Sequence, residues 1–152
     1  MRLKLSEATP SAKTKPSPAG AAPASGEDVH PLLDMETLRS LEAALPAGVF
    51  TKFLSLFFAD IGTHLAEITH AREREDLKAI ARLAHNLASS AGCVGAAQTS
   101  IIARDLEQAC RKGDRESCER LLGQLAESAG AAVVALRLWL QARPEEAARE
   151  AM

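Results

Sequence analysis

The chain of 152 residues has no tyrosine, only 3% aromatic residues and a formal net charge of -2. Proteins that bind single-stranded nucleic acid stack its bases on aromatic side chains and neutralise its phosphates with lysine and arginine. This sequence offers neither a strong basic excess nor a set of stacking residues. Nucleic acid is therefore not an expected partner.

Long hydrophobic runs are also missing. No apolar stretch approaches the roughly 20 residues that a membrane-spanning helix needs. The segment 1–5 leads into serine and proline without the apolar centre of a signal peptide. We therefore expect no membrane association and a cytoplasmic location.

Cysteine is scarce. The three cysteines, Cys93, Cys110 and Cys118, are odd in number and lack a paired metal-ligand spacing. This pattern predicts reduced thiols that pack as small hydrophobic residues. With 47% hydrophobic and 25% charged residues, the chain can bury one core without disulfides or metals.

Proline is concentrated near the N-terminus, where residues 1–28 hold four of the seven prolines among alanine, serine, lysine and glycine. This segment has no apolar periodicity, and its composition is typical of a flexible tail or linker. Pro144 disfavours extension of the last helix. We predict a tail over 1–28, one domain over 29–143 and a C-terminal tail over 144–152.

Within that domain, apolar residues recur every three or four positions, which predicts helices and no strand. Asp34, Asp76 and Asp114 are suited to cap three helix starts, and glycines near 92–95 and at 113 mark two ends. A short first helix ends near position 45. A long second helix runs to about position 71, with the apolar stripe Phe50, Phe53, Leu54, Phe57, Ile61, Leu65 and Ile68. The last helix ends near position 141. The prediction is an all-α, antiparallel up-down-up-down four-helix bundle with the short N-terminal helix packed at one end.

The third long segment places one histidine on a face of small residues. Its predicted buried stripe is Leu77, Ile80, Ala84, Leu87, Ala91 and Val94. His85 projects roughly 130° from the centre of that stripe, so we expect its imidazole in solvent. The neighbours within two turns on the same side are Lys78, Ala81, Arg82, Ala88, Ser89 and Gly92.

This segment resembles the motif of histidine-containing phosphotransfer (HPt) domains, which reads roughly H-x-L-K-G-S-(S/A)-x-x-x-G-A. The positions that agree are His85, Leu87, Ser90, Ala91, Gly95 and Ala96. Ala88 stands where the family usually has lysine, and Ser89 where it usually has glycine. The resemblance extends from Leu32 to about Gln141, including the entry 33–38 and the turn 106–114.

The resemblance implies a phosphorelay intermediate that accepts a phosphoryl group on His85 from a receiver-domain aspartate and passes it to another receiver aspartate. A neutral imidazole is a suitable nucleophile for this step. The implied partners are response-regulator receiver domains, which hold Mg2+, and a hybrid histidine kinase. The chain itself is then a monomeric phosphocarrier that binds no cofactor and has no independent turnover.

The missing lysine leaves open how the phosphate charge is balanced. Lys78 and Arg82 precede His85 on its face and could contact the phosphoryl oxygens, or they could be ordinary solvated charges. Ser89 could donate a hydrogen bond to the phosphate or simply be a solvated serine. The small residues Ala81, Ala88, Ser89 and Gly92 would let a receiver domain approach His85 closely.

Two alternatives follow from the same residues. Without lysine at position 88, the chain could be a receiver- or kinase-binding helical module with weakened or no phosphotransfer. The segment from Glu67 to His70 matches the Glu-x-x-His element of di-metal helical bundles, which raises a metalloenzyme. Such a site needs a second Glu-x-x-His element and two more inward carboxylates. The residues before His85 read Arg82-Leu83-Ala84 instead, so the metalloenzyme is disfavoured.

Overall fold

The computed structural model describes residues 30–142. In this range it contains helices and no strand. The helices are α1 (Met35–Ala44), α2 (Ala47–Glu73), α3 (Leu77–Cys93), α4 (Ala97–Arg111) and α5 (Arg115–Gln141). The predicted tails at 1–28 and 144–152 lie outside the described residues.

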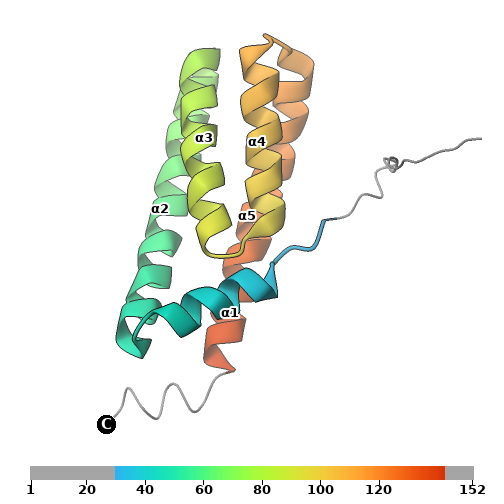
Figure 1. The fold of residues 1–152 in the computed structure, drawn as a ribbon. Helices are drawn as coiled ribbons and strands as arrows, with labels where there is room; N and C mark the ends of the chain where they lie inside the picture. Colours follow the sequence, from blue (N-terminus) through green and yellow to red (C-terminus); the bar gives the residue numbers. More distant parts are fainter. Residues whose placement is uncertain (1–29, 143–152) are drawn as a thin grey trace, which may run out of the picture. The chain divides into compact units, whose positions relative to one another are not determined.

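The four long helices, α2 to α5, lie side by side and alternate in direction, and α1 crosses one end of the bundle (Figure 1). Helices α3 and α4 are neighbours along their length, joined by a tight turn, and α2 packs on the other side of α3. The all-α prediction is confirmed.

The three predicted aspartate caps are confirmed. The Asp34 carboxylate accepts hydrogen bonds from the amides of the first turn of α1, at 3.1 and 3.3 Å. Asp76 accepts from the amide of Ala79 at 3.1 Å, and Asp114 from the amide of Ser117 at 3.1 Å. Such bonds satisfy backbone donors that have no partner inside the helix, so these positions define where α1, α3 and α5 begin.

The turn between α3 and α4 is held against the start of α1. The amide of Asp34 donates a 2.7 Å hydrogen bond to the carbonyl oxygen of Gly95. Gly95 has a φ of +80°, and a Cβ atom there would lie 2.8 Å from the carbonyl oxygen of Asp34. Only glycine tolerates both this backbone conformation and this approach. Gly95, the helix-ending glycine expected in this region, therefore also allows the start of α1 to pack against the α3–α4 turn.

The predicted core face of α3 is confirmed. Ile80, Ala84, Leu87, Ala91 and Val94 are buried, and Leu77 is half-buried. Because these residues occupy one side of α3, the opposite side is left for solvent and partners.

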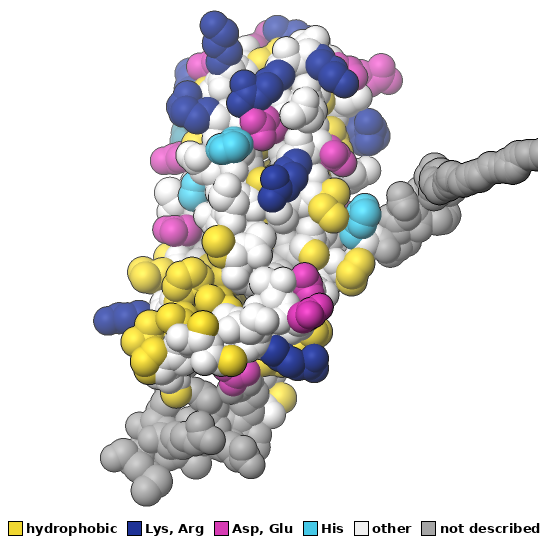
Figure 2. Space-filling view, in the orientation of Figure 1, with side chains coloured by type: hydrophobic (Ala, Val, Ile, Leu, Met, Phe, Trp, Pro, Cys, Tyr) yellow, Lys and Arg dark blue, Asp and Glu magenta, His cyan; other side chains and the backbone are white. Residues whose placement is uncertain are grey.

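The prediction that Phe53 of α2 belongs to the core is wrong, since it is 37% exposed. Phe53 lies about 60° from the buried Phe50 on the helical wheel, at the edge of the apolar stripe. Val49 and Leu56 of α2 are also exposed, at 49% and 59%. Hydrophobic side chains gather in Figure 2 where α1 and α2 meet. This part of α2 is only partly covered by its neighbours.

Helices α2 and α5 are long and apolar enough to cross a membrane by length and composition alone, contrary to the expectation from the sequence. Both contribute side chains to the bundle core, Phe50 from α2 and Leu125 from α5 among them. Core helices of helical bundles pass the same test, so this property is weak evidence for a membrane span.

Candidate functional site

His85 lies in the middle of α3 with its side chain 62% exposed, as the sequence predicts. Its Nδ1 atom is 3.2 Å from Oε1 of Glu107 in α4. Glu107 is not among the site residues expected from the sequence. The structure thus adds a carboxylate from the neighbouring helix to the histidine.

Glu107 is in turn held by Arg111, one turn later in α4. Its Oε2 atom accepts hydrogen bonds from Nε of Arg111 at 3.0 Å and from Nη2 at 2.6 Å. These bonds, and secondarily the bond to His85, hold the pKa of Glu107 below its usual value against the opposing effect of burial. Glu107 is therefore a carboxylate at neutral pH.

The Glu107 contact determines which imidazole nitrogen is available for chemistry. An ionised carboxylate only accepts hydrogen bonds, so Nδ1 of His85 must carry the proton that it donates. In a neutral imidazole the lone pair is then on Nε2. Because the side chain is mostly exposed, Nε2 is the atom that an incoming group can reach.

Ala81 is only 4% exposed, so the expectation that it lies on the exposed docking face is wrong. The same holds for Ala88, which faces α4 and is 2% exposed. Its carbonyl oxygen accepts a 2.8 Å hydrogen bond from the Ser100 hydroxyl. Gly92 is half-buried and also lies against Ser100 of α4, since a Cβ atom at Gly92 would lie 3.4 Å from Oγ of Ser100. The small residues on this side of α3 lie against α4 and allow the two helices to pack closely.

Lys78, Arg82 and Ser89 are exposed, as expected. Within residues 30–142 neither Lys78 nor Arg82 makes an ion pair. Ser89 lines a groove of about 360 Å³ between α2 and α3. The other residues of that groove are Phe53, Leu56, Phe57, Asp60, Ser90, Cys93 and Val94. The side of α3 that carries Ser89 is thus the one that remains open to a partner.

The Glu67–His70 element, which suggested a metal site, does not form such a site in the structure. Glu67 and His70 are exposed on α2, and Nδ1 of His70 is 3.7 Å from Glu73. No group of three histidine, cysteine, aspartate or glutamate side chains is placed to hold a metal ion in the part of the chain that the structure describes.

The cysteines are free thiols in the structure. Cys93 is exposed, whereas Cys110 of α4 and Cys118 of α5 are buried with their Sγ atoms 3.1 Å apart. Burial, followed by the contact with Cys118, raises the pKa of the Cys110 thiol to about 12. The prediction of small hydrophobic thiols therefore fits Cys110 and Cys118 but not Cys93.

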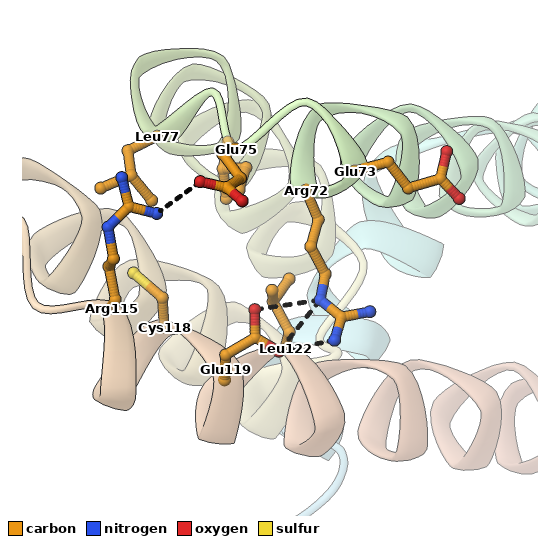
Figure 3. Close-up of a pocket in the computed structure, with 9 residues that line it drawn as sticks. Arg72, Glu73, Glu75, Leu77, Arg115, Cys118, Glu119 and Leu122 are labelled. Carbon is orange, nitrogen blue, oxygen red and sulfur yellow. Dashed lines mark hydrogen bonds and ion pairs between the residues drawn. The ribbon is translucent and has the colours of Figure 1, made fainter.

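A second hollow, of about 560 Å³, lies between α2 and α5 near the α2–α3 turn (Figure 3). Four of its charged side chains form two ion pairs, Arg72 with Glu119 at 2.7 Å and Arg115 with Glu75 at 3.5 Å. The lining residues do not include His85 or Glu107. The hollow is therefore separate from the histidine site.

Comparison with known protein families gives a match to the Hpt domain over residues 52–143, more than half of the chain. The chain belongs to the Hpt domain family. The family resemblance of the sequence is thereby confirmed, and the chain is a phosphocarrier that serves as an intermediate in phosphorelays. Partners of Hpt domains in these relays are response-regulator receiver domains.

Two solved structures share the fold. Histidine-containing phosphotransfer protein B (HptB) from Pseudomonas aeruginosa has a TM-score of 0.70 and 21% identity, over 74% of this chain and 97% of that protein. A rice protein assigned as a histidine-containing phosphotransfer protein has a TM-score of 0.64 and 20% identity, over 76% and 84% respectively. A search of curated proteins gave no match.

Glu107 was missed because it lies 22 positions after His85, on another helix. A signal was nevertheless present in the sequence. Glu107 lies beside Leu106 and near Ala109, which belong to the apolar face of α4, and it precedes Arg111 by four residues. A carboxylate at the edge of a core face with an arginine one turn away is typical of a charge that has a specific partner.

Proposed function

We propose that His85 is the phosphoryl acceptor of this Hpt domain and that Nε2 is the attacking atom. The observation that carries this proposal is the exposed imidazole whose Nδ1 atom lies 3.2 Å from the Glu107 carboxylate. In the proposed step, Nε2 forms a bond to phosphorus while the bond from phosphorus to the receiver aspartate oxygen breaks. The aspartate carboxylate leaves, and the reverse reaction delivers the group to another receiver.

Glu107 supports this step electrostatically. As the Nε2 lone pair is used to form the N–P bond, positive charge develops on the imidazole ring. A carboxylate already hydrogen-bonded to Nδ1–H offsets that charge without having to move. Arg111 holds the carboxylate in place from the other side. Phosphoryl transfer depends mainly on positioning and charge stabilisation, and Glu107 and Arg111 contribute to both on the histidine side.

The remaining functional assignments follow from this role. We infer that the receiver domain supplies Mg2+ and the aspartate, and that the chain binds no cofactor and has no turnover of its own. A hybrid histidine kinase is the inferred source of the phosphoryl group, upstream of the first receiver. The chain is inferred to act as a cytoplasmic monomer.

The experiment that tests the proposal is transfer from a receiver domain phosphorylated with a radiolabel, in the presence of Mg2+. The expected label on the chain is acid-labile and base-stable, as a phosphohistidine is. The variant His85→Gln should accept no label. His70→Gln is its matched control, because His70 is also exposed but lies on α2. An unlabelled wild-type chain that still binds the receiver would favour the alternative of an interaction module without phosphotransfer.

A further inference from the structure

Two contacts fix the register of α3 against α4. Nδ1 of His85 contacts Glu107, and the carbonyl oxygen of Ala88 contacts the Ser100 hydroxyl. Ser100 and Glu107 belong to one stripe of α4, and Arg104 lies between them, four residues after the first and three before the second. Arg104 is therefore level with His85, at the outer edge of the seam between the two helices.

A phosphoryl group on His85 would create a charge imbalance there. It would bring a charge of about -2, as phosphorylation of other side chains does, close to the Glu107 carboxylate. The Arg111 guanidinium is already bound to Glu107 through two hydrogen bonds. Its positive charge offsets that of Glu107, so the phosphoryl charge is balanced only in part, by the positive charge of the imidazole ring.

Arg104 is a cation level with His85, and it is not engaged in an ion pair in the described range. It is exposed and makes no ion pair with the residues of the described range 30–142. We propose that Arg104 is the cation that stabilises the phosphoryl group on His85. This inference rests on the proposed role of His85 as the acceptor.

The side to which the imidazole turns favours Arg104 over Lys78 and Arg82. Nδ1 of His85 contacts Glu107, so the ring is turned toward α4. Lys78 begins two turns before His85, and Arg82 lies with the exposed Ser89 on the side of His85 that faces away from α4. The α4 side is occupied by Arg104. Its guanidinium can also form two parallel hydrogen bonds to phosphoryl oxygens.

The test measures how a phosphoryl label distributes at equilibrium between a receiver domain with Mg2+ and the full chain. Arg104→Gln is expected to lower the share on the chain, with the equilibrium constant falling about tenfold, the effect of losing one hydrogen bond to a charged group. Arg104→Lys is expected to restore most of that loss. Arg39→Gln, an exposed arginine of α1, is the matched control and is expected to leave the constant unchanged.

Two results would overturn the inference. One is an unchanged equilibrium in Arg104→Gln, and a fall in the double variant Lys78→Ala with Arg82→Ala would then assign the role to those residues. The other is an equal fall in Arg39→Gln. Thermal unfolding of each variant confirms that the fold is intact, since all these side chains are exposed. Absence of label from the wild-type chain would instead refute the role of His85, so failure of the two proposals is distinguishable.

Discussion

The hydroxyl of Ser100 donates a 2.8 Å hydrogen bond to the backbone carbonyl of Ala88, across the seam between α3 and α4. A side chain much larger than alanine at this level would push the helices apart. The small residues around His85 therefore have two different physical causes. Those facing α4 allow close packing of the helices, and only those facing away from α4 keep space for a partner.

Replacement of His85 by glutamine is expected to abolish phosphoryl acceptance while preserving the fold. The side chain is 62% exposed, and Glu107 keeps Arg111 as a partner. Exposed substitutions usually change the free energy of unfolding by less than about 0.5 kcal/mol. Radiolabel transfer from a receiver measures phosphoryl acceptance, and thermal unfolding measures whether the fold is preserved. A label retained on the variant would place the acceptor elsewhere.

Replacement of Glu107 by alanine is expected to slow phosphoryl acceptance without preventing it. Only the strengthening of this hydrogen bond as the ring gains positive charge affects the rate, and a difference of about 1.4 kcal/mol corresponds to roughly tenfold. Single-turnover transfer from a phosphorylated receiver measures the effect. Glu73→Ala, a glutamate of α2 exposed to solvent, is the control. Equal rates for both variants would show that the contact with His85 has no role in the reaction.

The lowered pKa of Glu107 predicts how stability depends on pH. An unfolded glutamate has a pKa of about 4.3, and in the folded chain the Arg111 bonds lower that value. The folded state then binds fewer protons than the unfolded state, so Glu107 stabilises the fold above about pH 4.3, and this stabilisation is lost as the pH falls toward the lower folded value. Denaturant unfolding of wild type and Glu107→Gln should differ near neutral pH and converge in acid. A gap that widens in acid would contradict the assignment.

Most of the fold could be predicted from the sequence because its signals are local. The aspartates Asp34, Asp76 and Asp114 cap helices through residues two or three positions away, and the apolar period of α3 fixes its core face. The exposure of His85 follows from the same period. The partners of His85 could not be derived in this way, because Glu107 is brought to it by the packing of two helices. The burial of Ala88 has the same origin in the packing of α4.

Substitution of Gly95 tests whether the close packing of α1 against the α3–α4 turn contributes to stability. Gly95→Ala is expected to destabilise the chain both through its positive φ and through the contact of the new Cβ with the Asp34 carbonyl. Gly113 has a φ of +73° but open space around it, so Gly113→Ala isolates the backbone cost of about 1–2 kcal/mol. Denaturant unfolding should show a clearly larger loss for Gly95→Ala. Equal losses would mean that the close approach of α1 is not energetically important.

Ser89 and Gly92 lie four and seven residues after His85, yet large substitutions there are expected to act differently. A phenylalanine at Gly92 would meet Ser100, and overpacking of this kind costs about 1–3 kcal/mol, so we expect reduced thermal stability.

Ser89 is exposed beside the groove between α2 and α3. Ser89→Trp should leave the fold intact and hold a docking receiver away from His85, where a displacement of about 1 Å costs on the order of 100-fold in rate. A small phosphodonor such as phosphoramidate should still label the variant, because it needs no docking surface. Ser40→Trp, an exposed serine of α1, provides the control. If Ser89→Trp and Ser40→Trp accept the group from the receiver at the wild-type rate, the receiver does not dock over the Ser89 side of α3.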